Sequence, residues 1–254
     1  MKVLLILVDG MRPDALADLP IAQKVLKKSA YNLNAQTVFP SVTLPCHMSL
    51  FYSVPPERHG TTNNDFTPWV RPMDGLMETL RAKEKKCAMF YDWWALRNVA
   101  RPNATSYCHF ASGMKLGRYE SCEMNTAAAL TFLPKYHTDF AFLYYGVPDH
   151  MGHEHGWMGE EYMKSVRFCW DQIDQVLEAL GDEYTVIITA DHGGHARTHG
   201  TTMPEDMIIP LMILGKDIQP GEAFADANLM DIAPTVAKLL GVDPNPEWEG
   251  KSLL

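Results

Sequence analysis

Short apolar runs rich in β-branched and aromatic residues recur along the chain at wide intervals. The clearest are residues 3–8, 139–146 and 184–189, and weaker ones are 87–91 and 210–214. Apolar runs of this length without polar alternation are typical of parallel strands that are covered on both faces. We therefore expect buried strands in these five segments.

Helical periodicity appears between these runs. The clearest stripe extends from Met163 to Leu180, with apolar residues three or four apart, and it ends at Gly181. Further helices are predicted near 74–83 and 231–240. Strands that alternate with helices indicate βαβ units, so we predict an α/β fold with a mostly parallel sheet.

The bulk properties narrow the class of protein. A chain of 254 residues fits one sizeable domain, and we predict a single domain over 1–254. The net charge of −9 argues against a polymeric nucleic acid as partner, since phosphate backbones are bound by clustered lysine and arginine. A small anionic substrate held by local cations is still compatible with this charge.

The compartment is predicted from the cysteines and the apolar runs. The five cysteines are scattered and odd in number, which indicates reduced thiols in the cytoplasm. The N-terminal apolar run is short and meets Asp9, so we interpret it as a strand and not as a signal peptide. No run approaches the length of a membrane span.

Acidic residues follow three of the predicted strands: Asp9, Asp149 and Asp191. Ligands bind beyond the carboxyl ends of the strands in open α/β sheets, so these acids should converge at one edge. Carboxylates are rarely buried without partners. Converging acids without compensating bases predict a bound cation.

Histidines accumulate in the same part of the chain. Six of the ten lie between 149 and 199, namely His150, His153, His155, His192, His195 and His199. Imidazole and carboxylate ligands without cysteine suit zinc, manganese or iron. For His150 and His155 we expect solvated positions or, at most, a supporting role.

The spacing of the acids and histidines predicts two kinds of local structure. Asp149 and His153 are four residues apart, so one helical turn would turn both toward one ion. Asp191 and His192 are adjacent and need an irregular loop, which the glycines at 193 and 194 permit.

Thr43 lies just ahead of Pro45, where a helix should begin. One interpretation is that Thr43 merely caps this helix. The other uses the same position for chemistry, because free N–H groups and a positive dipole end suit a phosphate and an incipient alkoxide. A threonine hydroxyl is too weak an acid to ionise alone, so a metal would have to activate it.

Taken together, these residues resemble the alkaline phosphatase superfamily and, within it, the nucleotide pyrophosphatase/phosphodiesterase branch. The resemblance rests on LLILVDGMRPD (residues 4–14), FPSVTLPCH (39–47), HGTTNN (59–64), PDHMGHEHG (148–156), ADHGGHARTHG (190–200) and DIAPTVAKLLG (231–241). It covers nearly the whole chain in order. It implies a three-layer α/β/α sandwich.

The resemblance also implies roles for named residues. Two divalent metal ions are implied, with zinc preferred. One would be held by Asp149, His153 and His199, and the other by Asp9, Asp191, His192 and the Thr43 oxygen. Thr43 would attack phosphorus and form a phospho-threonine intermediate, which water would then hydrolyse. Asn64 would bind a phosphoryl oxygen, with Asn63 as the alternative.

Several departures from the family pattern shape the expectations. Leu44 stands where nucleotide-cleaving members usually have phenylalanine, which leaves nucleotide preference open. The segment from 64 to 149 is too short for the cap domain of the related phosphomutases. Thr43 with His47, in place of Cys-x-Pro-x-Arg, excludes an ordinary formylglycine sulfatase. Between His195 and His199 we prefer His199, because His-Gly is the usual form.

The leading hypothesis is therefore a two-metal hydrolase of phosphodiester or related phosphate ester bonds. A rival is a phosphomonoesterase or a phosphonoacetate hydrolase-like carbon–phosphorus hydrolase, which extra cations at the pocket, such as Arg58 or Arg197, would favour. A catalytically silent metal-binding interaction domain ranks low because no ligand is missing. The aromatic run 90–94 could line a substrate pocket, but buried core or a subunit interface is the preferred interpretation. A small phosphate ester is the expected partner, with no membrane.

Overall fold

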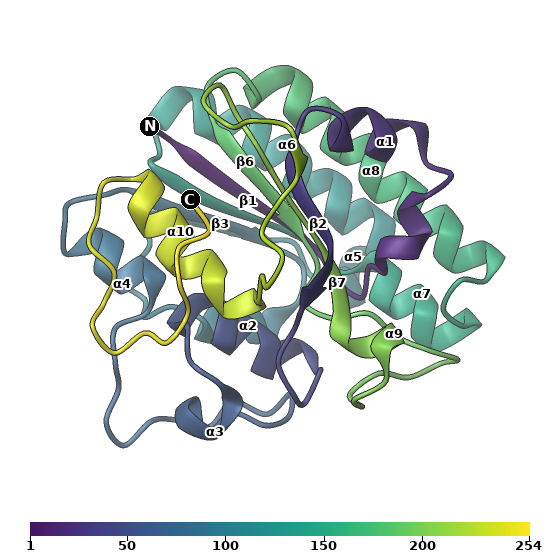
Figure 1. The fold of residues 1–254 in the computed structure, drawn as a ribbon, viewed down its shortest axis with the longest axis horizontal. Coiled ribbons are helices and arrows are strands. Elements are labelled where there is room, and N and C mark those ends of the chain that lie inside the picture. Colours follow the sequence, from purple (N-terminus) through teal and green to yellow (C-terminus); the bar gives the residue numbers. More distant parts are fainter.

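A central sheet organises the computed structural model, which describes residues 1–254 (Figure 1). Its eight strands follow the order β4-β3-β5-β1-β6-β7-β2-β8. They are β1 (Val3–Val8), β2 (Ala30–Gln36), β3 (Cys87–Tyr91), β4 (Tyr107–Phe110), β5 (Phe140–Tyr145), β6 (Thr185–Thr189), β7 (Ile208–Leu214) and β8 (Gly221–Glu222). Only β7 runs antiparallel to its neighbours β6 and β2, so the prediction of a mostly parallel sheet is confirmed.

The five predicted strands all form, because their apolar runs are covered on both faces. Every residue of β1, β3, β5 and β6 is buried. Strands β2, β4 and β8 were not predicted. Strand β2 contains Asn32 and Asn34, and β4 has four residues that alternate between half-buried and exposed. Strands β2 and β4 therefore lack the continuous apolar run on which the prediction depended, and β8 has only two residues.

Helices cover both faces of the sheet, which confirms the three-layer α/β/α arrangement (Figure 1). On one face lie α2 (Thr43–Tyr52), α4 (Leu76–Arg81) and α10 (Ile232–Leu239). On the other lie α1 (Pro20–Leu26), α6 (Arg118–Tyr136), α7 (Val147–His155) and α8 (Glu160–Leu180). Short helices α3 (Pro56–His59), α5 (Gly113–Leu116) and α9 (Pro204–Met207) complete the connections.

The helices that the sequence predicted are those with an apolar stripe. Helix α8 buries Val166, Trp170 and Ile173 along the predicted face. Helix α6 was missed, although it is almost as long. Its buried face includes Ser121, Asn125 and other small or polar residues, so it lacks the hydrophobic period that marks a helix in a sequence.

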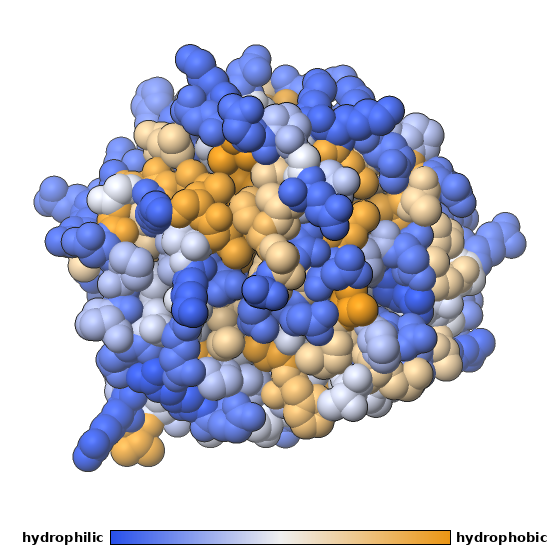
Figure 2. All heavy atoms as spheres, in the orientation of Figure 1, coloured by the Kyte–Doolittle hydropathy of each residue, from blue (hydrophilic) through white to orange (hydrophobic).

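The surface in the orientation of Figure 1 is unevenly covered. Hydrophobic residues gather between α10 and α1, over the region of β2 and β6, and hydrophilic residues surround them (Figure 2). No helix in the structure is both long and apolar enough to span a membrane. All five cysteines are unpaired, and only Cys108 is exposed.

The register of the central strands determines where the site lies. In β1, Leu7 is level with Tyr144 of β5 and with Thr189 of β6. The three strands are parallel, so their carboxyl ends meet at one edge of the sheet. The segments that follow them therefore leave the sheet side by side.

Candidate metal centre and active site

The three predicted acids do meet at this edge. Asp9 follows β1 directly, Asp191 comes two residues after β6, and Asp149 lies in the first turn of α7, which follows β5. Asp9 and Asp191 are almost fully buried. The convergence expected from the strand ends is thus present in the fold.

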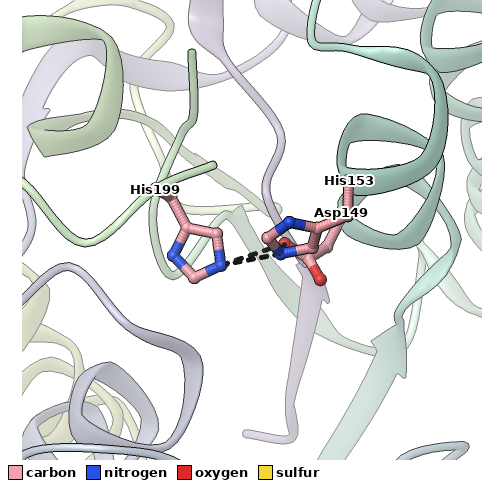
Figure 3. Close-up of side chains that lie close together, drawn as sticks. All are labelled: Asp149, His153 and His199. Carbon is pink, nitrogen blue, oxygen red and sulfur yellow. Dashed lines mark hydrogen bonds and ion pairs between the residues drawn. The ribbon is translucent and has the colours of Figure 1, made fainter. Parts of the chain in front are cut away.

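One group of metal-ligand type consists of Asp149, His153 and His199 (Figure 3). The Nε2 atoms of His153 and His199 are each 3.5 Å from Asp149 Oδ1 and 3.1 Å from one another. Asp149 and His153 are one turn apart on α7, as their spacing predicted. His199 comes from the loop after β6 and faces this pair.

The two histidine rings of this group are oriented by backbone carbonyls. Nδ1 of His153 lies 3.0 Å from the carbonyl oxygen of Arg197, and Nδ1 of His199 lies 2.8 Å from that of Ser41. A carbonyl can only accept, so each Nδ1 carries the proton in a neutral ring. Each Nε2 is then left with a lone pair directed at the other ligands.

A second group forms around His192. Its Nε2 lies 3.4 Å from Asp9 Oδ1, 3.4 Å from Asp191 Oδ2 and 3.2 Å from the Thr43 hydroxyl. Ligand atoms of Asp9, Asp149 and His192 all lie within 4.8 Å of one another. Asp149 is therefore close to both groups, and the two form one continuous centre.

Three carboxylate oxygens in this centre test whether a cation fits. Asp9 Oδ1, Asp149 Oδ1 and Asp191 Oδ2 are buried and have no hydrogen-bond partner. Buried carboxylate oxygens without partners are costly unless a cation compensates them. The free oxygens face the histidine Nε2 atoms, and this donor set suits divalent zinc, manganese or iron.

Burial shifts the pKa values of the acids and histidines in this centre. Burial, together with repulsion by Asp191 and Asp149, raises the pKa of Asp9 well above its ordinary value. Burial also lowers the pKa of His192 and His199 to about 4. Neutral imidazoles are the form in which histidine coordinates a metal, and a cation would offset the repulsion among the carboxylates that raises the pKa of Asp9.

Thr43 belongs to the centre and does not cap its helix. The N-cap of α2 is Val42, and no side chain makes a capping hydrogen bond there. Thr43 is the first residue of the helix, only 4% exposed, with its hydroxyl turned to His192. The interpretation of Thr43 as a mere N-cap is wrong.

Asn64 lies at the same helix end. Its Oδ1 accepts a hydrogen bond from the backbone N–H of Leu44 at 3.0 Å. Asn63 instead accepts from the N–H of Asp65 within its own turn. Buried His59 contacts Ser49 of α2 at 3.0 Å and so anchors the segment that presents Asn64.

The remaining candidates lie outside the two groups. His195 Nδ1 contacts buried Asp206 at 2.7 Å, which leaves His199 as the histidine that faces the acids. His150 and His155 contact the exposed Glu154. Arg58, considered as a phosphate-binding cation, forms ion pairs with glutamates 247 and 249.

Sequence reasoning missed the aromatic side chains that support the centre. Trp157 Nε1 and the Tyr162 hydroxyl both donate to the carbonyl of Gly10 at 2.9 Å. Gly10 has a φ of +67°, and a Cβ there would lie 3.0 Å from the Asp149 Cα. Tyr144 donates a hydrogen bond to Asp9. Of these residues, only Gly10 could have been identified from the sequence, because it directly follows the first acid.

Comparisons with known proteins identify the family and several relatives. Residues 3–211 match the profile of a family described as type I phosphodiesterase / nucleotide pyrophosphatase. The chain is 32% identical over 139 residues to a 2,3-bisphosphoglycerate-independent phosphoglycerate mutase of Desulforudis audaxviator, with 51% of this chain and 26% of the relative covered. It is 27% identical over 222 residues to the mouse bis(5'-adenosyl)-triphosphatase enpp4, with 76% and 47% covered. It thus spans half or less of these relatives.

Solved structures show the same fold. Murine ectonucleotide pyrophosphatase/phosphodiesterase 5 superposes with a TM-score of 0.83 at 15% identity, over 99% of this chain and 98% of the other. A phosphonate monoester hydrolase from Silicibacter pomeroyi superposes with a TM-score of 0.74 at 16% identity, over 99% and 75%. At such identities the likeness concerns the fold alone.

Proposed function

Because this chain belongs to the type I phosphodiesterase / nucleotide pyrophosphatase family, we propose that it hydrolyses phosphate esters with two divalent cations and with Thr43 as nucleophile. The observation that carries the proposal is the set of three buried, unpartnered carboxylate oxygens in a centre whose His192 lies 3.2 Å from the Thr43 hydroxyl. Carboxylates that served only packing would have hydrogen-bond partners, because a buried carboxylate oxygen without one is costly.

The ligands proposed for the cations are those of the two groups. One cation is assigned to Asp149, His153 and His199, and the other to Asp9, Asp191, His192 and the Thr43 oxygen. Zinc is the preferred metal because the donors are imidazole nitrogens and carboxylate oxygens, with manganese or iron as alternatives. Bound cations would lower the pKa of a coordinated hydroxyl and offset the charge that develops on the phosphoryl oxygens.

The side chains themselves account for the order of bond changes. The Thr43 hydroxyl gives its proton to solvent, and its oxygen forms a bond to phosphorus while the bond to the leaving oxygen breaks and its electron pair departs with that oxygen. The oxygen of a water molecule then bonds to phosphorus, the bond between phosphorus and the Thr43 oxygen breaks, and the Thr43 oxygen takes up a proton from that water. Asn64 has its Oδ1 occupied by the Leu44 N–H, so its Nδ2 is free to donate to a phosphoryl oxygen.

The preferred substrate is a phosphodiester or a related small phosphate ester. The family and the relative named as a bis(5'-adenosyl)-triphosphatase support this choice. The alternative is a phosphomonoesterase or a phosphonoacetate hydrolase-like activity, and the fold neighbour named as a phosphonate monoester hydrolase keeps it open. The ion pairs of Arg58 with glutamates weaken this alternative, because they occupy one of the two arginines that could have bound a terminal phosphate.

Two further predictions accompany this proposal without bearing on its chemistry. They are a single domain over residues 1–254 without a cap, and a cytoplasmic location. The oligomeric state is open, with a homo-oligomer as one option. The catalytically silent metal-binding domain ranks last, because both the proposed nucleophile and its ligands are present.

The Thr43→Ala variant tests the nucleophile. It removes the attacking oxygen, so turnover of chromogenic mono- and diesters should fall by about three orders of magnitude or more. Stability should change by less than about 1 kcal/mol, since the hydroxyl makes no capping bond. Thr43→Ser should retain part of the activity because it keeps a hydroxyl.

A rapid-quench experiment on the parent enzyme should capture phosphate on Thr43, which peptide mass spectrometry can locate. The control is Thr126→Ala, whose hydroxyl contacts Tyr145 away from the centre and which should turn over at the parent rate. An alanine variant at position 43 that turns over like the parent would overturn the assignment.

A further inference from the structure

Asp9 presents its two carboxylate oxygens to different surroundings. Its Oδ2 accepts a hydrogen bond from the hydroxyl of Tyr144, on the neighbouring strand β5. Its Oδ1 has no partner and lies 3.4 Å from His192 Nε2. No other side chain or backbone group donates to this carboxylate. Tyr144 therefore decides which oxygen of Asp9 is left free for a cation.

Asp191 is held by backbone donors and not by a side chain. Its Oδ1 accepts from the backbone N–H groups of Gly10 and His192, at 3.2 and 3.0 Å, and its Oδ2 is left free. The two acids thus follow one pattern, with one oxygen fixed and one open. For Asp191 the donors are main-chain groups, whereas for Asp9 the donor is a side chain that can be removed.

The surroundings of Tyr144 keep it in place. The ring packs edge-on against His47, with 5.5 Å between the ring centres, and the residue is only 2% exposed. Packing therefore holds its hydroxyl against Asp9, to which it donates.

We propose that Tyr144 is a positioning residue for the metal centre, which holds Asp9 in the orientation that leaves Oδ1 facing the cation. This inference rests on the proposed function, because it requires a cation at Asp9 and His192. Groups that hydrogen-bond to metal ligands fix the orientation of those ligands, and their loss typically costs roughly 10–100-fold in metal affinity. Without its hydroxyl partner, the Asp9 carboxylate is free to rotate, and its Oδ2 loses its only partner.

The test compares Tyr144→Phe with Tyr145→Phe. Tyr145 is the next residue of the same buried strand, and its hydroxyl contacts Thr126 at 2.8 Å, away from the centre. Both variants remove one buried hydroxyl, so effects on packing are matched. Zinc affinity of the metal-free proteins is measured by competition with a chromogenic chelator. Tyr144→Phe should bind one of its two zinc ions roughly 10–100-fold more weakly, and Tyr145→Phe should bind both within about twofold of the parent.

A double-mutant cycle makes the result specific. If Tyr144 acts through Asp9, adding Tyr144→Phe to Asp9→Ala should weaken zinc binding no further. An additional loss in that background, or equal zinc affinity in the parent and Tyr144→Phe, would overturn the inference. A parent protein that binds no zinc, manganese or iron would instead overturn the proposed function on which it rests. The two failures are therefore distinguishable without any measurement of turnover.

Discussion

His195 and His199 show how much the position of a single residue decides. They have the same chemistry and are four residues apart, yet His199 faces Asp149 at 3.5 Å while His195 contacts Asp206. Asp206 is fully buried, and its other oxygen accepts two hydrogen bonds from Thr201. His195 therefore stabilises the loop that carries His199 and lies outside the group of Asp149, His153 and His199.

Alanine at each position should separate these roles. His199→Ala should lower the metal content by about one ion per chain and remove most of the activity, as expected for a lost ligand. His195→Ala should keep nearly normal metal content and lose about 1–3 kcal/mol of unfolding free energy, because buried Asp206 loses a hydrogen-bond partner. Elemental analysis and urea unfolding measure the two effects. The opposite pattern would mean that His195 is the ligand.

Among the elements, α7 (Val147–His155) is the one whose packing most constrains the centre. It carries Asp149 and His153 on one face and lies against Trp157, whose indole donates to Gly10. Gly152 is the point of contact. A Cβ at this position would lie 2.6 Å from the Trp157 ring, so only glycine allows the helix to lie so close.

Gly152→Ala should therefore destabilise the protein, although helix propensity alone would predict a gain of up to about 1 kcal/mol. Overpacking of a buried ring typically costs about 1–3 kcal/mol, and the displaced indole should also disturb the metal site. Urea unfolding shows whether the free energy of unfolding of the variant is lower or higher than that of the parent. Ala127→Gly, at an exposed position of α6, is the control and should cost about 1 kcal/mol through propensity. A more stable Gly152→Ala variant would show that Trp157 moves aside without penalty.

For the whole molecule, the centre joins segments that are far apart in the chain. Ligand atoms come from the ends of β1, β5 and β6 and from the start of α2, so a bound cation would link most of the fold. The net charge of −9 adds to the repulsion among the buried acids. Cations that bind the folded chain more tightly than the unfolded chain stabilise it by mass action.

Removal of metal by a chelator should consequently lower the unfolding temperature, and added zinc should restore it. At a free metal concentration of a thousand times the dissociation constant, the stabilisation is about 4 kcal/mol. Differential scanning calorimetry measures the effect. In the Asp149→Ala variant, which lacks an acid close to both groups, the chelator should have much less effect. Equal unfolding temperatures with and without chelator, in protein shown to contain metal, would contradict the proposed centre.

Much of the fold and of the candidate site could be predicted because the signals are local. The runs that became β1, β3, β5, β6 and β7 are apolar throughout, since strands buried on both faces need no alternation. Because an acid follows each of three parallel strands, the sequence also predicted that the three acids meet at one edge of the sheet. The structure also brings together all the residues predicted as ligands, together with Thr43 and Asn64. Their chemical roles stay predictions.

The sequence by itself determined the strand runs, the type of ligand and the helical spacing of Asp149 and His153, because each depends on residues close together in the chain. Tertiary structure alone decided that β2, β4 and α6 form, since their own patterns are mixed and, for β2, the partner strand β7 lies far away in the chain. It also decided that Thr43 faces His192 and not its helix end, and that Tyr144 holds Asp9. These contacts join residues more than 100 positions apart, so no local pattern could record them.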